Sequence, residues 1–170
     1  TGTSHFNHRQ IARIPANLRM RDMESNKMNQ TVKTPVHLWI VSILAILWNA
    51  GGAYDYIATQ YRIESYMSKF TPEQLEYFYA FPAWMDAAWA VGIWGAMLGS
   101  IALLLRKAWA VWLFAASILG LAVSTVYNFV LSDGAAAMGE GAAMFTGIIW
   151  IIALFLFFYA RAMARRKVLA

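Results

Sequence analysis

The chain has 170 residues, of which 60% are hydrophobic and 14% are charged, and its formal net charge is +5. In a soluble domain about a quarter of the residues are ordinarily charged, so this composition argues against a soluble globular protein. The absence of cysteine excludes disulfides, thiolate metal sites, iron–sulfur clusters and cysteine nucleophiles.

The first segment, residues 1–35, is polar and basic, and we expect it to lie in the cytoplasm. It has no apolar run before Val36 that would serve as the core of a cleavable signal peptide. Its cations are sparse and interrupted by acidic residues, which disfavours nucleic acid and favours anionic lipid headgroups or a partner protein. Met20, Met23 and Met28 are each a possible first residue of the natural chain. The sequence therefore leaves open whether residues 1–27 belong to the mature protein.

Four long apolar runs follow, separated by the charged segments. They cover residues 36–58, 84–105, 108–131 and 142–160. At 1.5 Å per residue the first run covers roughly 34 Å, which is enough to cross a bilayer. Runs of this length without period-two alternation are helices rather than barrel strands, because each backbone group in lipid must bond within its own segment. The sequence therefore predicts an all-α membrane protein, a four-transmembrane-helix bundle over residues 36–160.

The segment between the first two runs contains the start of a short helix. Thr71 fits the N-cap position, Pro72 the first helical position, and Gln74 the third residue after the cap, as in a capping box. The aromatic-rich sequence LEYFYAF follows. We expect a short interfacial helix at the membrane–water boundary in this loop.

Lys and Arg divide unevenly between the two sides that this topology creates. All of them lie in the amino-terminal segment, in the second-to-third link or in residues 161–170, except Arg62 and Lys69. Because positively charged loops stay in the cytoplasm, we predict that both termini are cytoplasmic and that residues 161–170 form a basic tail. The link at Arg106 and Lys107 is so short that the second and third runs must form an antiparallel hairpin.

Small residues predict where the helices pack, because apolar side chains gain little by leaving lipid for another helix. The predicted helix-packing residues are Gly92, Gly95, Ala96, Gly99 and Gly120. Among them, Gly95 and Gly99 form a GxxxG step. This step would pack within one subunit or, as the alternative, between subunits.

Four polar residues lie in the halves of the spans that face away from the basic side. They are Asn49 and Asp55 in the first run, Asp86 in the second and Asn128 in the third. An ionisable residue costs roughly 2.5–3.5 kcal/mol at mid-membrane, so such residues usually face the protein interior, a partner or water. These four residues are the candidate ligand-binding site.

Two hypotheses account for these polar residues. In the first, they line an outward-facing pocket whose walls are Trp48, Trp84 and Trp89, with the aromatic rings covering the apolar side of a small ligand. In the second, they are structural. The carboxylates then lie in the wet boundary layer or at a helix start, and the amides bond across helices.

No catalytic or metal-binding pattern accompanies these residues. The sequence has no nucleophile motif and no phosphate-binding loop, and its histidines are His5, His8 and His37. Their positions exclude a haem held by two histidines between the spans. We therefore expect no enzymatic activity, no metal and no cofactor, while a bound lipid, carotenoid or quinone is left open.

Four groups of residues from about Met28 onward carry a resemblance to a known family. They are Leu47-Trp48-Asn49 with Gly52 and Asp55, then Pro82-Ala83-Trp84 with Trp89-Ala90, then Gly95 to Gly99, and the basic turn Arg106-Lys107-Ala108-Trp109-Ala110. With them the chain resembles small proteobacterial four-span membrane proteins that often carry the automatic label "sugar transporter". The resemblance implies a bacterial inner membrane protein. Residues 1–27 lie outside it.

Two functions are left open by the sequence. The first is a structural or accessory subunit of a larger inner-membrane complex, favoured by the small size and by the bulky apolar fourth run. The second is an oligomeric carrier of small, sugar-like solutes, favoured by the polar cluster and by the family label. The expected partners are the lipid bilayer and either other membrane subunits or further copies of the chain, but no nucleic acid.

Overall fold

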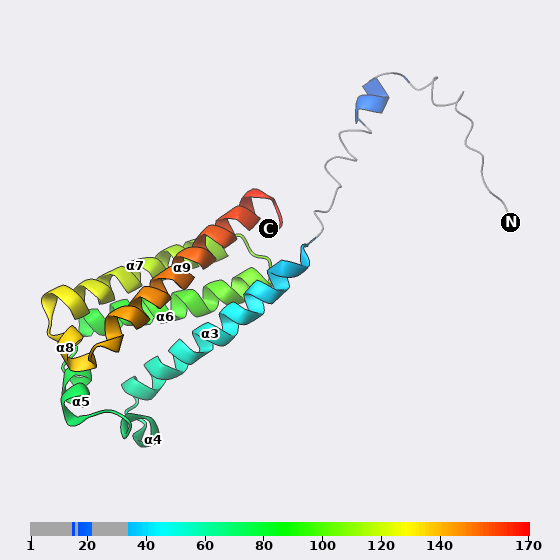
Figure 1. Cartoon of the computed structure of the whole chain (residues 1–170). Coiled ribbons are helices and arrows are strands. Elements are labelled where there is room, and N and C mark those ends of the chain that lie inside the picture. The colour runs from blue at the N-terminus through cyan, green and yellow to red at the C-terminus, as the bar shows by residue number, and fades with distance from the viewer. Residues whose placement is uncertain (1–14, 16, 22–33) are drawn as a thin grey trace. The chain divides into compact units, whose positions relative to one another are not determined.

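Four long helices dominate the computed structural model of the chain, and short helices join them at one end (Figure 1). The structure describes residues 15, 17–21 and 34–170. Thr1–Lys33 and Thr34–Ala170 are two separate units, and the second contains all four long helices. In the first unit, residues 17–21 are helical, and the expectation for the rest of the amino-terminal segment lies outside the described residues.

The long helices are α3 (Val36–Gln60), α6 (Ala83–Leu104), α7 (Ala110–Val126) and α9 (Gly141–Arg165). A π-helical turn, η1 (Tyr127–Leu131), continues α7, so the third span runs from Ala110 to Leu131. All four spans are long and apolar enough to cross a membrane. The prediction of an all-α four-helix membrane bundle is therefore confirmed, and the chain is a multi-pass integral membrane protein.

The fourth helix is longer than the sequence predicts. The apolar run ends at Ala160, but the helix continues to Arg165. Ala, Arg and Met are strong helix formers, so nothing in this stretch stops the helix. Arg165 in the last turn also interacts favourably with the negative end of the helix dipole.

The last residues of the chain pack against the bundle. Val168 and Leu169 are 9% and 5% exposed and belong to the hydrophobic core. The Ala170 N–H donates to the Arg106 carbonyl (2.7 Å), and the Ala108 N–H donates to the Ala170 carbonyl (2.9 Å). The last residues of the predicted basic tail, 161–170, are thus part of the bundle.

Three long helices end with a basic residue in the left-handed conformation. Arg62, Arg106 and Lys167 follow α3, α6 and α9 with φ angles of 51°, 58° and 56°. After Arg106, the Lys107 N–H donates back to the Ala102 carbonyl (2.8 Å). This is a Schellman motif, in which glycine is the usual left-handed residue.

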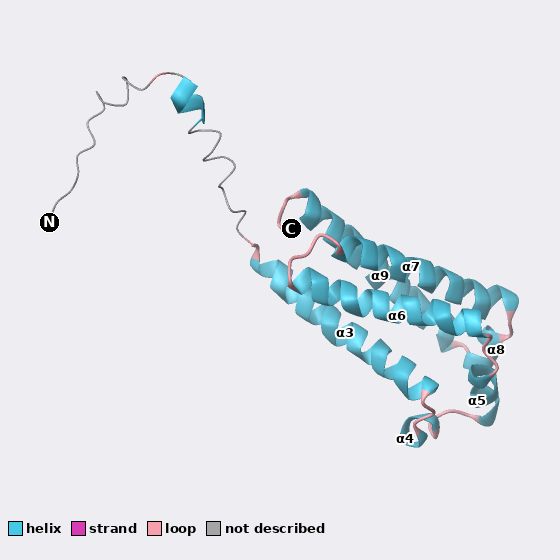
Figure 2. Cartoon of the chain, turned by 180° about the vertical axis from the view of Figure 1, so that it is seen from behind, coloured by secondary structure: helices cyan, strands magenta, loops and turns pink. Residues whose placement is uncertain are grey.

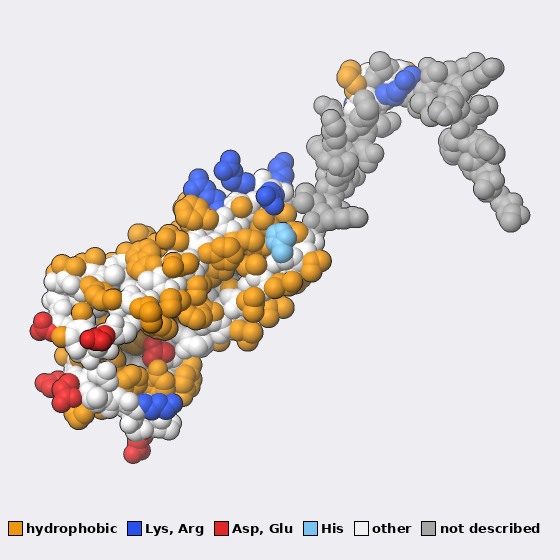
Figure 3. Space-filling model, in the orientation of Figure 1, with side chains coloured by type: hydrophobic (Ala, Val, Ile, Leu, Met, Phe, Trp, Pro, Cys, Tyr) orange, Lys and Arg blue, Asp and Glu red, His pale blue; other side chains and the backbone are white. Residues whose placement is uncertain are grey.

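Charged side chains gather at two opposite ends of the bundle (Figure 3). Arg106, Lys107 and the cations of residues 161–167 lie at the end where α6 turns into α7, which we call the basic end. The opposite end, which we call the loop end, carries α4 (Glu64–Met67), α5 (Pro72–Tyr79) and α8 (Gly134–Met138).

The α5 helix begins with the predicted capping box. Thr71 Oγ1 accepts a hydrogen bond from the Gln74 N–H (3.3 Å), and Gln74 Oε1 accepts one from the Thr71 N–H (3.1 Å). Pro72 occupies the first helical position. The short helix expected in this loop is therefore confirmed, and the loop contains a second one, α4, that the sequence does not predict.

The helices pack in chain order, and α6 and α7 approach most closely. A β-carbon on Gly120 would lie 2.5 Å from the carbonyl oxygen of Ala88 and from the nitrogen of Gly92. Ser117 Oγ also donates a 2.6 Å hydrogen bond to the Gly92 carbonyl. Close backbone approach and an interhelical hydrogen bond therefore hold this hairpin together.

The other predicted packing residues divide between two faces of α6. Gly95 and Gly99 are buried against α7, where Gly99 faces the ring of Phe114. Ala96 instead faces a cavity on the side of α6 nearer to α3. Apart from Ala96, the predicted packing residues lie in an interface within one chain.

The hydrophobic core lies at the basic end, where all four spans meet. Leu38, Leu103, Phe114 and Leu156 contribute one buried side chain each from α3, α6, α7 and α9. Figure 2 shows α3 beside α6 in this bundle. Toward the loop end, the space between α3 and α9 is occupied by a cavity.

Candidate functional site

A cavity of about 750 Å³ occupies the loop-end part of the bundle. All four spans contribute to its wall, and the core residues Phe114 and Leu156 close it toward the basic end. The surface in Figure 3 is hollowed near the loop end. The position of this hollow is set by α3 and α9, which flank the central α6–α7 hairpin on two sides.

Aromatic rings from the loop cover the loop end of the cavity. Phe70, Phe78 and Phe81 line it. The rings of Phe70 and Phe78 pack edge to face at 5.3 Å, and those of Phe81 and Trp89 at 6.1 Å. Each such pair contributes about 0.5–1.5 kcal/mol beyond its buried area, so the rings hold α5 against the bundle.

Two aromatic residues border the cavity between α3 and α9. The rings of Trp48 and Phe145 lie 6.4 Å apart, and both residues line the cavity. Both are also exposed at a level that lies within the spans, where the surroundings are lipid. This side of the cavity is therefore in contact with the lipid phase.

Asp55 is the one charged residue among those that line the cavity. Its Oδ1 accepts a 2.6 Å hydrogen bond from the phenol of Tyr66, in α4. Burial, together with this hydrogen bond, raises the pKa of the Tyr66 phenol above its ordinary value. Tyr66 therefore stays protonated and donates to Asp55 at neutral pH.

Asn49 and Asn128 also line the cavity, and both amides bond within the chain. Asn49 Nδ2 donates to the Ala45 carbonyl (2.9 Å) and to Ser100 Oγ in α6 (3.0 Å). Asn128 Oδ1 accepts a 2.6 Å hydrogen bond from the phenol of Tyr77 in α5. These bonds across elements are what the structural hypothesis expects for the two asparagines.

One hydroxyl group in the cavity wall has no partner. Ser124 lines the cavity and is 9% exposed, and its Oγ is the one buried side-chain polar atom without a hydrogen bond in the described part of the chain. The neighbouring Ser117 and Thr125 hydroxyls both bond to backbone carbonyls. An unpaired buried hydroxyl costs about 1–3 kcal/mol, and this oxygen is itself shielded by the surrounding atoms.

Asp86 lies outside the cavity, in contrast to the pocket hypothesis. It occupies the first turn of α6 and accepts a 2.9 Å hydrogen bond from Gln60 Nε2 at the end of α3. A carboxylate in the first turn is stabilised by the positive end of the helix dipole. Asp86 thus has the position that the structural hypothesis gives it.

Trp84 also lies outside the cavity, while Trp48 and Trp89 line it. Trp84 is 51% exposed, and its ring packs edge to face against Tyr127 at 5.4 Å. Five residues along a helix correspond to a rotation of about 140°, so Trp84 and Trp89 face different sides of α6.

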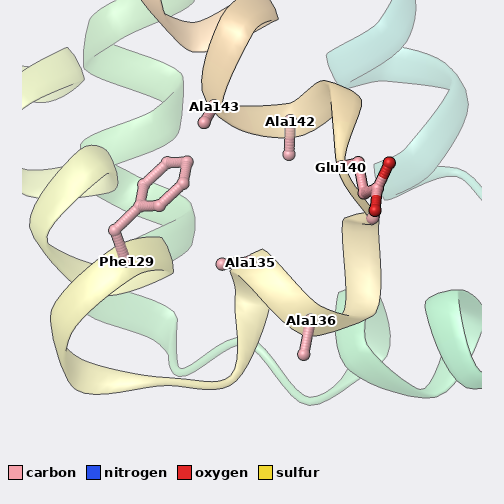
Figure 4. Close-up of a pocket in the computed structure, with 7 residues that line it drawn as sticks. Phe129, Ala135, Ala136, Glu140, Ala142 and Ala143 are labelled. Carbon is pink, nitrogen blue, oxygen red and sulfur yellow. The ribbon is translucent and has the colours of Figure 1, made fainter.

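A second, smaller hollow of about 340 Å³ lies between η1, α8 and α9 (Figure 4). Phe129 and four alanines line it, and the carboxylate of Glu140 points away from the Phe129 ring. It offers no cluster of polar groups. Among the residues that the structure describes, no group of three His, Asp or Glu could hold a metal ion.

Tyr66 and Ser124 are among the residues of the larger cavity that the predicted site lacks. Tyr66 lies in a loop, where no periodicity indicates which helix it contacts. Ser124 lies four residues after Gly120, on the same face of α7, so the pattern indicates packing. The pattern cannot indicate that the Ser124 hydroxyl stays unpaired.

The cavity therefore combines a large apolar and aromatic wall with one carboxylate and a few hydroxyl and amide groups. This combination suits a molecule with a long apolar part and a small polar group.

The resemblance to small four-span proteins stays a prediction. No protein-family model matches the chain, and neither does any curated protein or any solved structure.

Proposed function

We propose that this chain is a non-catalytic membrane protein that binds a molecule of the lipid phase in the cavity between α3 and α9. The observation that carries the proposal is the cavity itself, about 750 Å³ in volume and lined mainly by apolar and aromatic side chains. Pockets for small ligands have volumes of roughly 300–1,000 Å³ and this kind of lining. An empty cavity of this size would forgo dispersion contacts along all its walls.

The orientation of the chain decides which leaflet supplies the ligand. The distribution of Lys and Arg favours a cytoplasmic basic end in a bacterial inner membrane. The loop end then faces the opposite side. The ligand would come from the outer leaflet, through the side bordered by Trp48 and Phe145.

Two glycines allow a controlled test of this proposal. Gly51 lines the cavity, and Gly147 in α9 does not. A β-carbon on either residue would have no neighbour within 4 Å, so both positions have room for a side chain. Gly51→Phe would fill part of the cavity, whereas Gly147→Phe would add the same ring outside it.

The readout is the lipid that co-purifies with each variant in mild detergent, identified by native mass spectrometry of the intact protein. We expect the unmodified chain and Gly147→Phe to retain a bound molecule of lipid size, and Gly51→Phe to lose it. Equal retention by all three proteins would contradict the proposal, as would an unmodified chain that carries no bound lipid after reconstitution with membrane lipids.

A second candidate function is an accessory subunit of a larger inner-membrane complex. In the most apolar stretch of α9, 6% of the residues are buried within the bundle. Ile151, Phe155 and Phe158 are exposed along this helix. Such a bulky apolar face is suited to another membrane subunit. Co-purification in a fixed ratio with other polypeptides would support this function, and a monomer under the same gentle conditions would contradict it.

The transport alternative fits the cavity less well. A sugar needs many hydrogen-bonding partners, but Asn49 Nδ2 and Asn128 Oδ1 already bond within the chain, which leaves one half of each amide for a ligand. A carrier of this kind would be a homo-oligomer that loses uptake when Asp55 or Asp86 is replaced by Asn. Because Asp86 lies outside the cavity, loss of uptake in Asp86→Asn would favour transport over the proposed binding function.

A further inference from the structure

The charge of the cavity wall is confined to one residue near the loop end. Asp55 is the one charged residue that lines the cavity, and it lies about one and a half turns before the end of α3 at Gln60. Toward the basic end the cavity is closed by the apolar side chains of Phe114 and Leu156. An amphiphile that fills the cavity would therefore place its head group near Asp55 and its apolar tail toward Leu156.

The carboxylate of Asp55 is available to a second partner. Its Oδ1 accepts the hydrogen bond from Tyr66, and no described residue donates to Oδ2. Within the described part of the chain, no Lys or Arg pairs with Asp55. Asp55 is also partly exposed rather than enclosed. Because like charges repel and opposite charges attract, this position disfavours an anionic head group and favours a cationic one.

A continuous series of aromatic rings begins beside Asp55. The ring of Tyr66, whose phenol donates to Asp55, packs edge to face against Phe70 at 5.4 Å. The series continues through Phe78, Phe81 and Trp89. Successive ring centroids from Phe70 onward are 5.3, 6.2 and 6.1 Å apart. All five aromatic residues line the cavity and are partly exposed, so their rings form one wall next to the carboxylate.

A carboxylate next to aromatic rings is the chemistry that recognises an organic cation. The faces of aromatic rings attract cations, and ammonium groups that carry methyl groups are recognised in this way. One ring of the series already attracts a cation of the chain itself, because Lys69 Nζ lies 5.5 Å from the centroid of the Tyr66 ring. Lys69 is exposed and does not line the cavity, so the cavity side of the wall stays open to a ligand.

We propose that the cavity binds an amphiphile whose head group is an ammonium group, held near Asp55 and the rings of Tyr66 and Phe70. This inference rests on the proposed function, since it requires the cavity to hold a molecule of the lipid phase. Two kinds of molecule supply such a head group: long-chain amines, and phospholipids with an ethanolamine or choline head. Anionic and uncharged lipids fall outside this ligand class.

The test compares three ligands with the same long alkyl chain. They are the alkyltrimethylammonium ion, its uncharged isostere that ends in a tert-butyl group, and the alkylphosphocholine. The protein is the full chain in mild detergent, stripped of bound lipid, and native mass spectrometry measures the occupancy at increasing ligand concentration. We expect the cation to bind about tenfold more tightly than the isostere, because the two differ in charge but not in shape.

The alkylphosphocholine distinguishes the two sources of the head group. It carries the same trimethylammonium group as the cation, but next to a phosphate. Binding as tight as that of the cation would support a phospholipid as the ligand, and binding about tenfold weaker would support an amine without a phosphate.

Three variants connect the preference for the cation to individual residues. Asp55→Asn keeps an oxygen that can accept from Tyr66, and it should reduce the preference to less than about threefold because the charge is lost. Phe70→Leu keeps an apolar side chain but removes a ring, and it should lower the preference by about two- to fivefold. Asp86→Asn is the matched control, since it removes a loop-end carboxylate outside the cavity, and it should bind all three ligands as the unmodified chain does.

The outcomes separate this inference from the function on which it rests. If neither the cation nor its isostere binds to the unmodified chain, the proposed lipid-phase function fails. If the isostere binds as tightly as the cation, or if Asp55→Asn keeps the full preference, the head-group inference fails and the cavity remains a binding site. Should Asp55→Asn not fold, Phe70→Leu takes its place, and an unchanged preference in that variant would overturn the inference.

Discussion

The backbone of Gly120 in α7 lies directly against that of Gly92 in α6. A β-carbon on Gly120 would come within 2.5 Å of the Gly92 nitrogen, a separation that real β-carbons essentially never show. A β-carbon on Gly92 would make only an ordinary van der Waals contact, because its nearest atom would be the Leu121 nitrogen at 3.5 Å. The two glycines of one contact therefore differ in how much they tolerate a side chain.

Gly120→Ala should destabilise the protein by about 2–3 kcal/mol or more, since overpacking of this kind forces the helices apart. Gly92→Ala should change stability little, because its β-carbon fits and alanine favours the helix by up to about 1 kcal/mol. Thermal unfolding of both variants in the same detergent measures the difference. Equal melting temperatures for the two variants would contradict this geometry.

The sequence predicts the spans and the start of α5 well, because both depend on local properties. The length and apolarity of a segment determine whether it forms a helix in lipid, whatever its neighbours are. The capping box at Thr71 and Gln74 similarly closes within four residues. Such features can be predicted without knowledge of the tertiary contacts.

The candidate site is only partly predictable, because it depends on tertiary contacts between distant parts of the sequence. Whether Trp84 or Trp89 faces the cavity depends on how α6 is rotated against α3 and α7. The partners of Asn128 and Asp55 come from the loop helices α5 and α4, at sequence separations of 51 and 11 residues. Composition likewise cannot show that Leu169, next to a basic cluster, packs into the core.

Substitutions of Lys167 can measure how much free energy the left-handed conformation costs at the end of α9. Its φ of 56° strains any residue with a β-carbon, so Lys167→Gly should stabilise the protein by up to about 1 kcal/mol. Lys167→Ala keeps the strain and loses the favourable charge at the helix end, so it should destabilise slightly, by about 0.3–1 kcal/mol. Thermal unfolding distinguishes the two signs. Arg166→Gly is the control, because Arg166 has a negative φ of −79° and should gain nothing from glycine.

Leu169 tests whether the end of the chain stabilises the bundle. It is 5% exposed and packs in the core at the basic end. Leu169→Ala should destabilise the protein by about 2 kcal/mol, the lower part of the range for a buried leucine, because the segment can adjust. Denaturant titration in detergent measures the change. An unchanged midpoint would mean that this segment contributes nothing to the stability of the folded chain.

The Tyr66–Asp55 hydrogen bond should be lost at strongly alkaline pH. Burial and this bond raise the pKa of Tyr66 in the folded protein, so the bond stabilises the fold fully below the unfolded value of about 10. Its contribution disappears as the pH rises through the higher folded value. The absorbance of tyrosinate during an alkaline titration follows this step, which Tyr66→Phe should lack. Tyr77, whose pKa is also raised by burial, should still titrate late in that variant.

The membrane orientation can be tested with single cysteines, because the chain has none of its own. Ser65→Cys at the loop end and Ala108→Cys at the basic end replace exposed, uncharged residues, so neither changes the charge distribution that sets the topology. In intact bacterial cells, a membrane-impermeant maleimide should label Ser65→Cys, and it should label Ala108→Cys after the cells are opened. The reverse pattern would place the loop end in the cytoplasm. The cavity would then receive its ligand from the inner leaflet, although its chemistry would be the same.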